Sequence, residues 1–465
     1  MKILIAGGGE IGYHLAQILS MEAHEVTLID KKNDVADKAM QALDVRMVEG
    51  DATSIDCLRK GDIETAQVMI AVTSVDEVNI LASLIAKKVG VGEVIGRVRN
   101  TELTRPGSVL RPEDLGMTEI IHPEEQAAQE ILMLLKRSAA SDIENLAGGR
   151  LQVVGIRLEA PPGNRNSWGE SCIVGKTVQE YDRMFPEFDF NVVAISRRGT
   201  PIMARGRNRL ENNDQVFILA KKEDIPRVIE TTGRKETDFS SVMIAEGSGV
   251  GERVMDHILN DPDLADKRWN VKMITQDEER AKRLSEKYHD RAMVLQGNPT
   301  DPDLLNQEGF SDSDAFLALT DDEESNIISC LMAKHLKARK VVALISKKDY
   351  INISQTIGLD AAVNTKLAAA NAIHRVIRRG NVLSITSLHG IAADAIEVEV
   401  KRRSRVAGKK VKKIEFPGNA VVGAVLKKTE DRVEIATGDT VLEPGDRVIL
   451  FTLPRFVVSV AALFQ

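Results

Sequence analysis

Three glycines near the start of the chain, Gly7, Gly9 and Gly12, have the spacing GxGxxG between an apolar run and an amphipathic segment. In such a turn the first glycine permits a tight bend, the second lets backbone amides approach a pyrophosphate, and the third lets a helix pack closely on the preceding strand. The start of that helix adds partial positive charge and unpaired N–H donors. With Glu10 and Ile11 between the last two glycines, the turn predicts a site for nucleotide phosphates. The alternative is that the glycines serve packing alone.

A carboxylate follows where it would meet the ribose of such a nucleotide. Asp30 ends the second apolar run, 30 minus 12 or 18 residues after Gly12, and could accept hydrogen bonds from both ribose hydroxyls. It would repel a 2′-phosphate, which favours NAD over NADP, although Lys31 and Lys32 weaken that preference. It does not distinguish NAD from ATP or ADP, because all three carry a free ribose diol.

The next two apolar runs also end in polar residues. Asp51, Ala52 and Thr53 follow the third run and would lie beside the adenine, although a turn with a helix N-cap at Asp51 or Thr53 accounts for them equally well. Thr73 and Asn79 flank the end of the fourth run, where ligands meet a parallel sheet, and capping is again the alternative.

Two arginines, Arg97 and Arg99, end the fifth run. One of them could reach a phosphate, and Arg97 is the one that we place in the candidate site. A surface salt bridge is the alternative for either side chain.

Catalytic and metal-binding clusters are missing from the sequence. The eight His residues are scattered, and His14 and His122 are expected to pack or to lie on the surface. The acidic run 321–324 fits the start of a helix better than a cation site. The three Cys residues lie far apart without a CxxC pair, which excludes a disulfide scaffold, argues against a metal site built from Cys and indicates a reducing compartment. We therefore expect no catalytic residue and no metal.

The chain consists of a two-part unit that occurs twice in tandem. Asn79 recurs as Asn326, 326 minus 79 or 247 positions later, within similar surroundings. The GKTV motif that starts at Gly175 recurs as GKKV at Gly408, 408 minus 175 or 233 positions later. The shorter second offset predicts an insertion in the first half, around residues 163–171.

The nucleotide turn is altered in the second copy, although Gly251 still matches Gly12. A carboxylate in the turn would repel phosphate, and a serine side chain would crowd the backbone. Asp277 could partly substitute for the missing ribose acid. We expect a weaker nucleotide site here, or none, so that only the first copy binds strongly. The replacements are Glu246 for Gly7, Ser248 for Gly9, Thr275 for Asp30, Asn298 for Asp51, and Leu344 and Ser346 for Arg97 and Arg99.

Strand and helix patterns alternate ahead of each β-rich stretch, and Ile11, Leu15 and Ile18 mark one face of the first helix. This alternation predicts a parallel, doubly wound sheet. The fold class is therefore α/β, a tandem duplication of a Rossmann-like doubly wound parallel-sheet lobe followed by a small β-rich α+β lobe. The predicted lobes are 1–138, 139–232, 233–383 and 384–465, with linkers at 139–150 and 231–241.

The composition fits several ordinary cores. The chain has 465 residues, 43% of them hydrophobic, and a net charge of 62 minus 69, or −7. This charge gives no support for a nucleic-acid partner. No apolar run reaches the ~18 residues of a membrane span. The first residues enter a strand at once, so no signal peptide is expected.

A basic run near the end of the chain holds eight Lys or Arg residues and no acidic residue, at 401–413. A solvated loop or strand edge explains it most simply. Contact with an anionic partner or membrane leaflet is the alternative.

Taken in order, these motifs resemble the TrkA family, the regulatory subunits of Trk-type potassium uptake systems. The resemblance rests on the GxGxxG turn, Asp30, the GDAT motif at 50–53, the TxxDxxN motif at 73–79, and the module that begins at Gly175, all followed by a second copy. It covers essentially the whole chain. Units of this family are RCK (KTN) domains, each with a nucleotide-binding lobe and a C-terminal lobe.

The resemblance implies regulation without catalysis. It implies NAD(H) and ATP or ADP as ligands, and it carries nucleotide contacts to Gly7, Gly9, Gly12, Asp30, Asp51, Thr53, Thr73 and Asn79. It also implies a homotetramer whose eight RCK units form a ring, bound from the cytoplasm to a membrane-embedded Trk potassium transporter subunit. The alternatives are a soluble NAD-dependent oxidoreductase with duplicated Rossmann domains and a soluble nucleotide-binding scaffold.

Overall fold

The structure is a computed structural model of the whole chain. The insertion expected around 163–171, together with Lys32 and Ser248, lies outside the residues that the structure describes. Those residues are 1–22, 24–31, 44–104, 108–160, 172–234, 237–246, 249–260, 269–310, 313–347, 350, 357–377, 384–388, 390–428 and 432–465.

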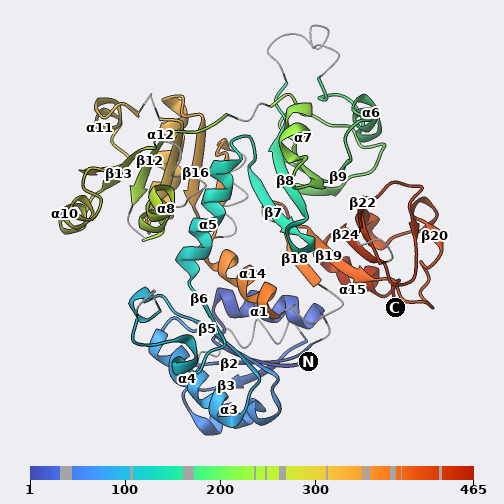
Figure 1. Cartoon of the computed structure of the whole chain (residues 1–465), viewed down its shortest axis with the longest axis horizontal. Coiled ribbons are helices and arrows are strands. Elements are labelled where there is room, and N and C mark those ends of the chain that lie inside the picture. The colour runs from blue at the N-terminus through green and yellow to red at the C-terminus, as the bar shows by residue number, and fades with distance from the viewer. Residues whose placement is uncertain are drawn as a thin grey trace. The chain divides into compact units, whose positions relative to one another are not determined.

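The chain begins with a six-stranded parallel sheet (Figure 1). Its strand order, β3-β2-β1-β4-β5-β6, is the doubly wound order and confirms the Rossmann-like prediction. The elements of this lobe are β1 (Lys2–Ala6), α1 (Glu10–Met21), β2 (Glu25–Asp30), β3 (Arg46–Glu49), α3 (Ile55–Lys60), β4 (Val68–Ala71), α4 (Asp76–Val89), β5 (Glu93–Arg97), β6 (Glu119–Ile121) and α5 (Pro123–Lys136).

The second copy repeats this sheet in the order β14-β13-β12-β15-β16-β17, again all parallel. The acidic run 321–324 forms a helix start as expected, because the Asp322 side chain accepts a hydrogen bond from the Ser325 amide (3.2 Å). The elements are β12 (Ser241–Glu246), α8 (Val250–Asn260), β13 (Asn270–Thr275), α10 (Glu278–Lys287), β14 (Met293–Gln296), α11 (Pro302–Gln307), β15 (Ala315–Leu319), α12 (Glu323–His335), β16 (Lys340–Leu344), β17 (Ala361–Val363) and α14 (Thr365–Ile377).

A small antiparallel sheet follows the parallel sheet of the first copy, in the order β10-β9-β11-β8-β7. The linker expected at 139–150 is wrong at its centre, because Asp142–Leu146 forms the edge strand β7. Its sequence, DIENL, is too short and polar to show a strand pattern and is ordered by pairing with β8. The elements are β7, β8 (Leu151–Arg157), α6 (Val178–Met184), β9 (Phe190–Arg197), β10 (Thr200–Met203), β11 (Gln215–Lys221) and α7 (Ile225–Thr231).

The corresponding sheet of the second copy has the order β18-β19-β24-β21-β22, beside a two-stranded sheet of β20 and β23. The basic run 401–413 includes β20 and a turn, which fits the strand-edge interpretation. The elements are β18 (Ser384–Ser387), β19 (Asp394–Glu399), β20 (Lys409–Lys410), β21 (Val421–Lys427), β22 (Arg432–Ile435), β23 (Val441–Leu442), β24 (Arg447–Thr452) and α15 (Val457–Ala461).

The two five-stranded antiparallel sheets share one apolar core, in which Leu219 of the first copy and Phe451 of the second are both buried. Gly423 allows the sheets to approach, because a Cβ there would lie 2.7 Å from Leu219 Cδ2 and 2.5 Å from the Phe451 ring. The Asn191 side-chain amide donates a hydrogen bond to the Val422 carbonyl across this contact (3.1 Å). The C-terminal lobes of the two copies therefore form one packed pair.

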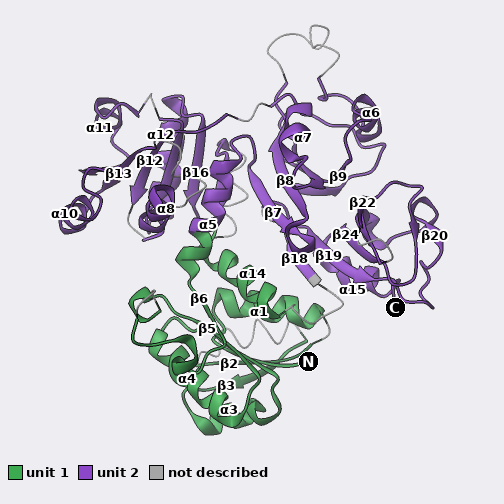
Figure 2. Cartoon of the chain, viewed as in Figure 1, with its two compact units in different colours: residues 1–127, 364–381 green, residues 128–363, 382–465 purple. Residues whose placement is uncertain are grey.

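Packing divides the chain into two compact units that cut across the copies (Figure 2). Unit 1 comprises Met1–Ala127 and Asn364–Asn381, and unit 2 comprises Ala128–Val363 and Val382–Gln465. The predicted lobes follow the duplication, whereas these units follow contacts: α14 comes from the second copy but belongs with the first parallel sheet.

Within unit 2, Lys340 at the start of β16 connects the second parallel sheet to the end of α5. Its buried ammonium group donates to the carbonyls of Leu134, Arg137 and Ala140 at 2.5, 2.8 and 2.8 Å. The Leu134 carbonyl belongs to the last turn of α5 and the other two follow the end of the helix, where a cation also complements the helix dipole.

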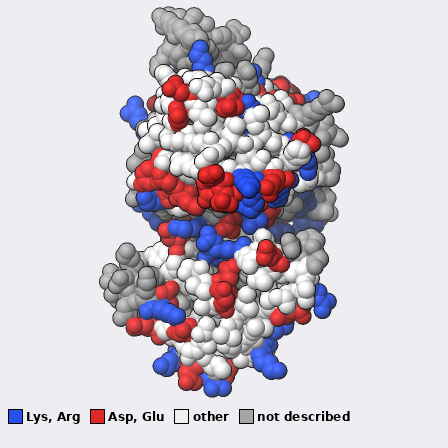
Figure 3. All heavy atoms as spheres, turned by 90° about the vertical axis from the view of Figure 1, so that its left-hand side faces the viewer, with Lys and Arg blue, Asp and Glu red and all other residues white. Residues whose placement is uncertain are grey.

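Charged side chains tie α10 to α8 on the surface of unit 2. Glu252 pairs with Arg283 (3.3 Å) and Lys287 (2.8 Å), and Lys287 also pairs with Asp256 (2.9 Å). Figure 3 looks onto the side of the chain that carries α10 and shows acidic side chains gathered there, with basic side chains among them. The pairs hold α10 beside the start of α8.

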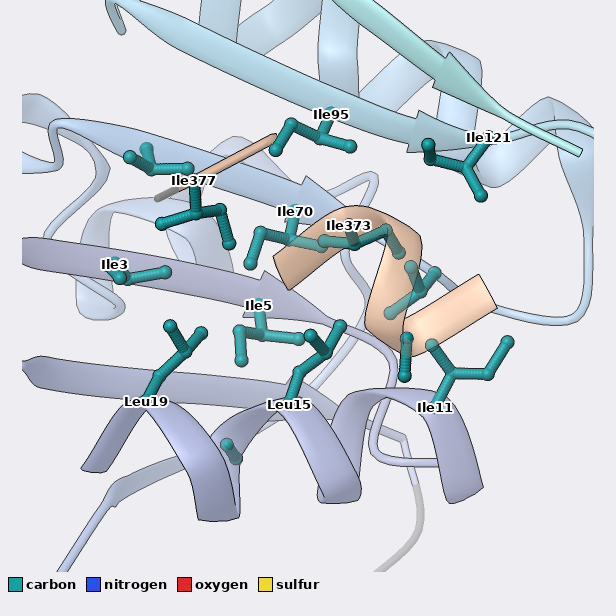
Figure 4. Close-up of a cluster of buried hydrophobic side chains, with 14 of the residues drawn as sticks. Ile3, Ile5, Ile11, Leu15, Leu19, Ile70, Ile95, Ile121, Ile373 and Ile377 are labelled. Carbon is teal, nitrogen blue, oxygen red and sulfur yellow. The ribbon is translucent and has the colours of Figure 1, made fainter. Parts of the chain in front are cut away.

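In unit 1, α14 completes the core on the α1 side of the sheet. Figure 4 shows Ile373 and Ile377 of α14 in one cluster with Ile11 and Leu15 of α1 and with Ile5 of β1. The predicted apolar face of α1 is thus buried, partly against a helix from the other copy. Among the described residues, no helix is both long and apolar enough to cross a membrane.

Candidate nucleotide-binding site

The three glycines of the first turn have different surroundings. Gly7 has φ 108°, and a Cβ there would lie 2.8 Å from the Thr73 amide nitrogen. A Cβ on Gly12 would lie 1.8 Å from the Gly7 carbonyl oxygen, so α1 packs directly on the turn. A Cβ on Gly9 would meet nothing within 4 Å. Of the three, Gly9 is therefore the one that leaves room for a ligand next to the backbone.

The start of α1 presents unpaired amides to that space. In the described part of the chain, no acceptor lies within hydrogen-bonding reach of the amides of Gly9, Glu10, Ile11 or Gly12. Gly9 precedes the helix and offers no capping side chain. Unpaired amides at a helix start bind phosphate oxygens well, because the helix dipole favours negative charge there.

Asp30 and Asp51 lie at the ends of the neighbouring strands β2 and β3. Asp30 accepts a hydrogen bond from the Gly8 amide (2.6 Å) and so touches the turn itself. Asp51 accepts from the Thr53 amide and hydroxyl (2.9 Å each) and pairs with Lys31 (3.0 Å). The bonds from Thr53 and then Lys31 lower the pKa of Asp51 to about 2, so this carboxylate is charged at neutral pH.

The residues around Asp51 differ from the capping alternative. The N-cap of α3 is Ser54, whose hydroxyl accepts from the Cys57 amide (3.4 Å), rather than Asp51 or Thr53. The Ala52 methyl group is buried in the core, so that only its backbone could face a ligand. Serine one position further along was the signal that the sequence interpretation passed over.

Asn79 is buried, and its side-chain amide is saturated by the chain. It accepts from the Thr73 amide (2.8 Å) and hydroxyl (2.7 Å), and donates to the carbonyls of Thr73 (3.1 Å) and Arg97 (3.0 Å). Asn326 makes the corresponding four bonds in the second copy, to Thr320 and Leu344. Asn79 thus fixes the ends of β4 and β5 relative to each other.

Arg97 lies beside Thr73 with part of its guanidinium unpaired. One terminal nitrogen donates to the Thr73 carbonyl (2.9 Å), whereas its buried Nε has no hydrogen-bond partner among the described residues. Burial, and then the charge of Arg99, lower the pKa of Arg97. Arg99 instead pairs with Glu124 (2.9 Å). An unpaired buried donor at this edge of the sheet fits an anionic ligand that supplies the acceptor.

Lys366, which α14 contributes to this site from the second copy, is a further candidate residue that the motifs do not predict. Its ammonium group pairs with Glu10 at the start of α1 (2.9 Å). No pattern in the sequence signals a contact between positions so far apart. His122 proves to be a packing residue as expected, with one ring nitrogen 2.7 Å from the Val98 carbonyl and the other 2.9 Å from the Thr104 hydroxyl.

The second lobe arranges the corresponding residues differently. Thr275 is buried at the end of β13 and offers no carboxylate, and Asp277 caps α10 by accepting from the Arg280 amide (2.8 Å). Asn298 repeats the Asp51 contact, accepting from the Thr300 amide and hydroxyl (3.0 and 2.9 Å). No cluster of His, Cys, Asp and Glu in the described part of the chain could hold a metal ion.

Family models match both copies of both lobes. The TrkA-N domain model matches residues 3–123 and 242–365, and the TrkA-C domain model matches residues 170–233 and 395–464. The chain belongs to the TrkA family. The matched pairs reproduce the duplication that the sequence predicts.

Relatives and solved structures agree with this membership. The Trk system potassium uptake protein TrkA of Halomonas elongata is 34% identical over 471 residues, which cover 100% of this chain and 99% of the relative. A TrkA homolog of Archaeoglobus fulgidus is 32% identical over 466 residues, 100% of both chains. The GsuK RCK domain aligns with a TM-score of 0.55 at 17% identity over 98% of this chain and 95% of its own. A GsuK channel bound to NAD has the same score and identity over 100% of this chain and 78% of its own. The solved structures share the fold, and together with the matched domain models they show a tandem RCK fold.

Proposed function

We propose that this chain is the nucleotide-binding regulatory subunit of a Trk-type potassium uptake system, and that its first lobe binds NAD(H), ADP or ATP. The observation that carries the proposal is the set of unpaired amides at the start of α1, open to solvent at Gly9 and flanked by Asp30. Curated relatives named as potassium uptake proteins support the transport role. A structural neighbour bound to NAD supports the choice of ligand.

In this proposal the phosphates bind the amides of Gly9 to Gly12, and the unpaired Arg97 Nε supplies a further donor. Asp30 accepts hydrogen bonds from the ribose hydroxyls, and these replace the bond that it accepts from the Gly8 amide. Asp51 and Thr53 lie on the adenine side, and two carboxylates there disfavour a 2′-phosphate. Thr73 lies at the end of β4, and Asn79 is a positioning residue that holds Thr73 in place.

Nucleotide binding in the first copy can affect the second copy, because α14 of the second copy packs on α1 of the first. A nucleotide shifts a conformational equilibrium only by its different affinities for the two states. Since the phosphates bind where Glu10 meets Lys366, a ligand that changes this contact changes how α14 is held. The role is regulatory, and we expect no turnover of the bound nucleotide. Steady oxidation of NADH with a small substrate would revive the oxidoreductase alternative.

We further propose that four copies of the chain assemble into a ring of eight RCK units on the cytoplasmic face of a membrane-embedded transporter subunit. An exposed apolar pair supports self-assembly: Leu81 and Leu84 on α4 are 45% and 40% exposed, and their counterparts Ile328 and Leu331 on α12 are 53% and 36% exposed. Residues three apart share one helix face. A closed ring of similar units needs the same contact surface on both copies, and this surface occurs on both.

The test combines binding with capture of the partner. Asp30→Ala should weaken NAD, ADP and ATP binding by about 10- to 100-fold in calorimetry, because about 1.5–3 kcal/mol of hydrogen bonds to a charged acceptor is lost. The control is Asp56→Ala, an exposed aspartate at the start of α3. Purification from native membranes should recover a polytopic transporter subunit. Unchanged affinity in Asp30→Ala would contradict the site, and recovery of the chain alone from the soluble fraction would contradict the role.

A further inference from the structure

Glu246 occupies the place of the first turn glycine in the second copy, at the end of β12. Its side chain is 0% exposed. The two carboxylate oxygens accept hydrogen bonds from the Gly249 amide (2.5 Å) and the Gly251 amide (2.7 Å). Both donors lie at the start of α8, so the carboxylate faces the positive end of that helix.

The first copy leaves the matching donors empty. Gly249 and Gly251 correspond to Glu10 and Gly12, whose amides have no acceptor in the described part of the chain. The two lobes thus share a helix start with amides available for an anion. In the first lobe those amides have no acceptor among the described residues, and in the second they bind a carboxylate of the same chain.

A cation completes the surroundings of Glu246. Arg280 of α10 approaches one carboxylate oxygen at 3.9 Å and is itself largely buried, with its side chain 25% exposed. The pairs of Glu252 with Arg283 and Lys287 hold α10 in this position. Backbone amides together with an arginine are the groups that proteins use for phosphate.

We propose that Glu246 is a resident anion of the second lobe: its carboxylate takes the position of a ligand phosphate at the start of α8, so that this lobe is held in its ligated arrangement by its own side chain. The inference rests on the geometry of the second lobe and stands whether or not the first lobe binds a nucleotide. The sequence alone predicts only that the Glu246 carboxylate repels a phosphate. In the proposal, the carboxylate also occupies the anion site itself.

Titration of Glu246 should report this buried position. Burial raises its pKa to about 7, against the lowering effects of the Gly249 and Gly251 amides and of Arg280, while Glu252 raises it further. Because the folded pKa lies above the unfolded value of 4.5, this group stabilises the fold fully below pH 4.5. The contribution is lost as the pH rises through about 7.

Chemical rescue tests the proposal. Glu246→Ala removes Cγ, Cδ and both carboxylate oxygens, which together match an acetate ion, and should lower the Tm by about 3–10 °C. Acetate, compared with chloride at equal ionic strength, should restore at least half of that loss. Wild type and Glu252→Ala, which loses an ion-paired carboxylate of α8 outside the turn, should respond much less. An equal response of all three proteins to acetate would overturn the proposal.

A second variant covers the case in which Glu246→Ala does not fold. Glu246→Gln keeps the size of the side chain but cannot ionise. The Tm of wild type minus that of Glu246→Gln should fall between pH 5 and pH 8, because only wild type must ionise a buried carboxyl group over that range. Equal Tm values for wild type and Glu246→Gln at every pH would mean that the Gly249 and Gly251 amides do not need both carboxylate oxygens, and would overturn the proposal.

Discussion

At the scale of single residues, Gly9 and Gly12 separate ligand binding from packing within one turn. Gly9→Ala should leave the Tm nearly unchanged, because its Cβ meets nothing within 4 Å, yet weaken nucleotide binding by about tenfold or more by filling the space beside the amides. Gly12→Ala should instead cost about 1–3 kcal/mol of stability through its clash with the Gly7 carbonyl. Thermal melts and calorimetry measure both. A Gly9→Ala protein with normal affinity would contradict the position of the phosphates.

Asn79 and Asn326 form a matched pair for telling structure from ligand contact. Each makes four bonds to the chain, so Asn79→Ala and Asn326→Ala should each cost about 2–4 kcal/mol of stability, with buried carbonyls and amides left unpaired. Denaturant melts of the two variants give the comparison. If Asn79→Ala lowered nucleotide affinity while leaving the melting curve of wild type intact, Asn79 would be a direct ligand contact instead of a positioning residue.

Spacing predicted which residues gather at the sheet edge, but not what each side chain does there. The glycine pattern placed the open turn correctly because backbone geometry depends on local residue types. Asn79 was expected at the ligand, with capping as the alternative, and its saturation by Thr73 and Arg97 depends on how two strands end in space. For Glu246, the sequence predicted only repulsion of a phosphate. Its bonds to the Gly249 and Gly251 amides form because the side chain folds back onto the start of α8.

At the scale of elements, a buried cluster of the Glu22 carboxylate and two histidine rings fastens α14 to the end of α1. Glu22 accepts a hydrogen bond from His374 of α14 (2.9 Å), and His24 lies 3.6 Å from its other oxygen. Burial alone would raise the pKa of Glu22, but the bonds from His24 and His374 outweigh it and lower the value from 4.5 to about 2. The cluster therefore stabilises unit 1 at neutral pH.

Removing one partner should loosen α14. His374→Ala should cost about 3 kcal/mol, because a buried carboxylate loses a donor, whereas the exposed His335→Ala on α12 should change stability by less than about 0.5 kcal/mol.

The Glu22 contribution is present above pH 4.5 and lost as the pH falls through about 2, so the advantage of wild type over Glu22→Gln should shrink in that window. Thermal melts between pH 7 and pH 3 test both statements, and a constant advantage would contradict the lowered pKa of Glu22.

The order of strands and helices could be predicted from the sequence far better than which of them pack against one another. The alternation of strands and helices was enough to predict both parallel sheets, because each pattern is local. That α14 packs on the sheet of the other copy could not be predicted, since its apolar face would fit either sheet. The strand β7 was missed for a related reason: its edge position is defined by β8 and not by its own polar sequence.

At the scale of the whole molecule, the duplication gives two parallel-sheet lobes that have the same strand order but differ at the start of the first helix. The amides at the start of α1 have no acceptor among the described residues, whereas two amides at the start of α8 bind Glu246. The paired C-terminal lobes, by contrast, share a core in which each copy contributes similar apolar strands. The nucleotide turn therefore differs between the copies, while the parallel sheet keeps the same strand order in both.

The same duplication makes assembly testable through equivalent surfaces. Leu81→Glu with Leu84→Glu on α4, or Ile328→Glu with Leu331→Glu on α12, should each reduce the mass of the proposed tetramer in light scattering, because charges would be buried in a contact between chains. Val458→Glu is the control, since Val458 is 61% exposed on α15, outside this face. Nucleotide binding should survive in all variants, which shows that they fold. Should both double variants remain tetrameric, the exposed pairs of α4 and α12 would not be the assembly surface, and the ring would need another contact common to both copies.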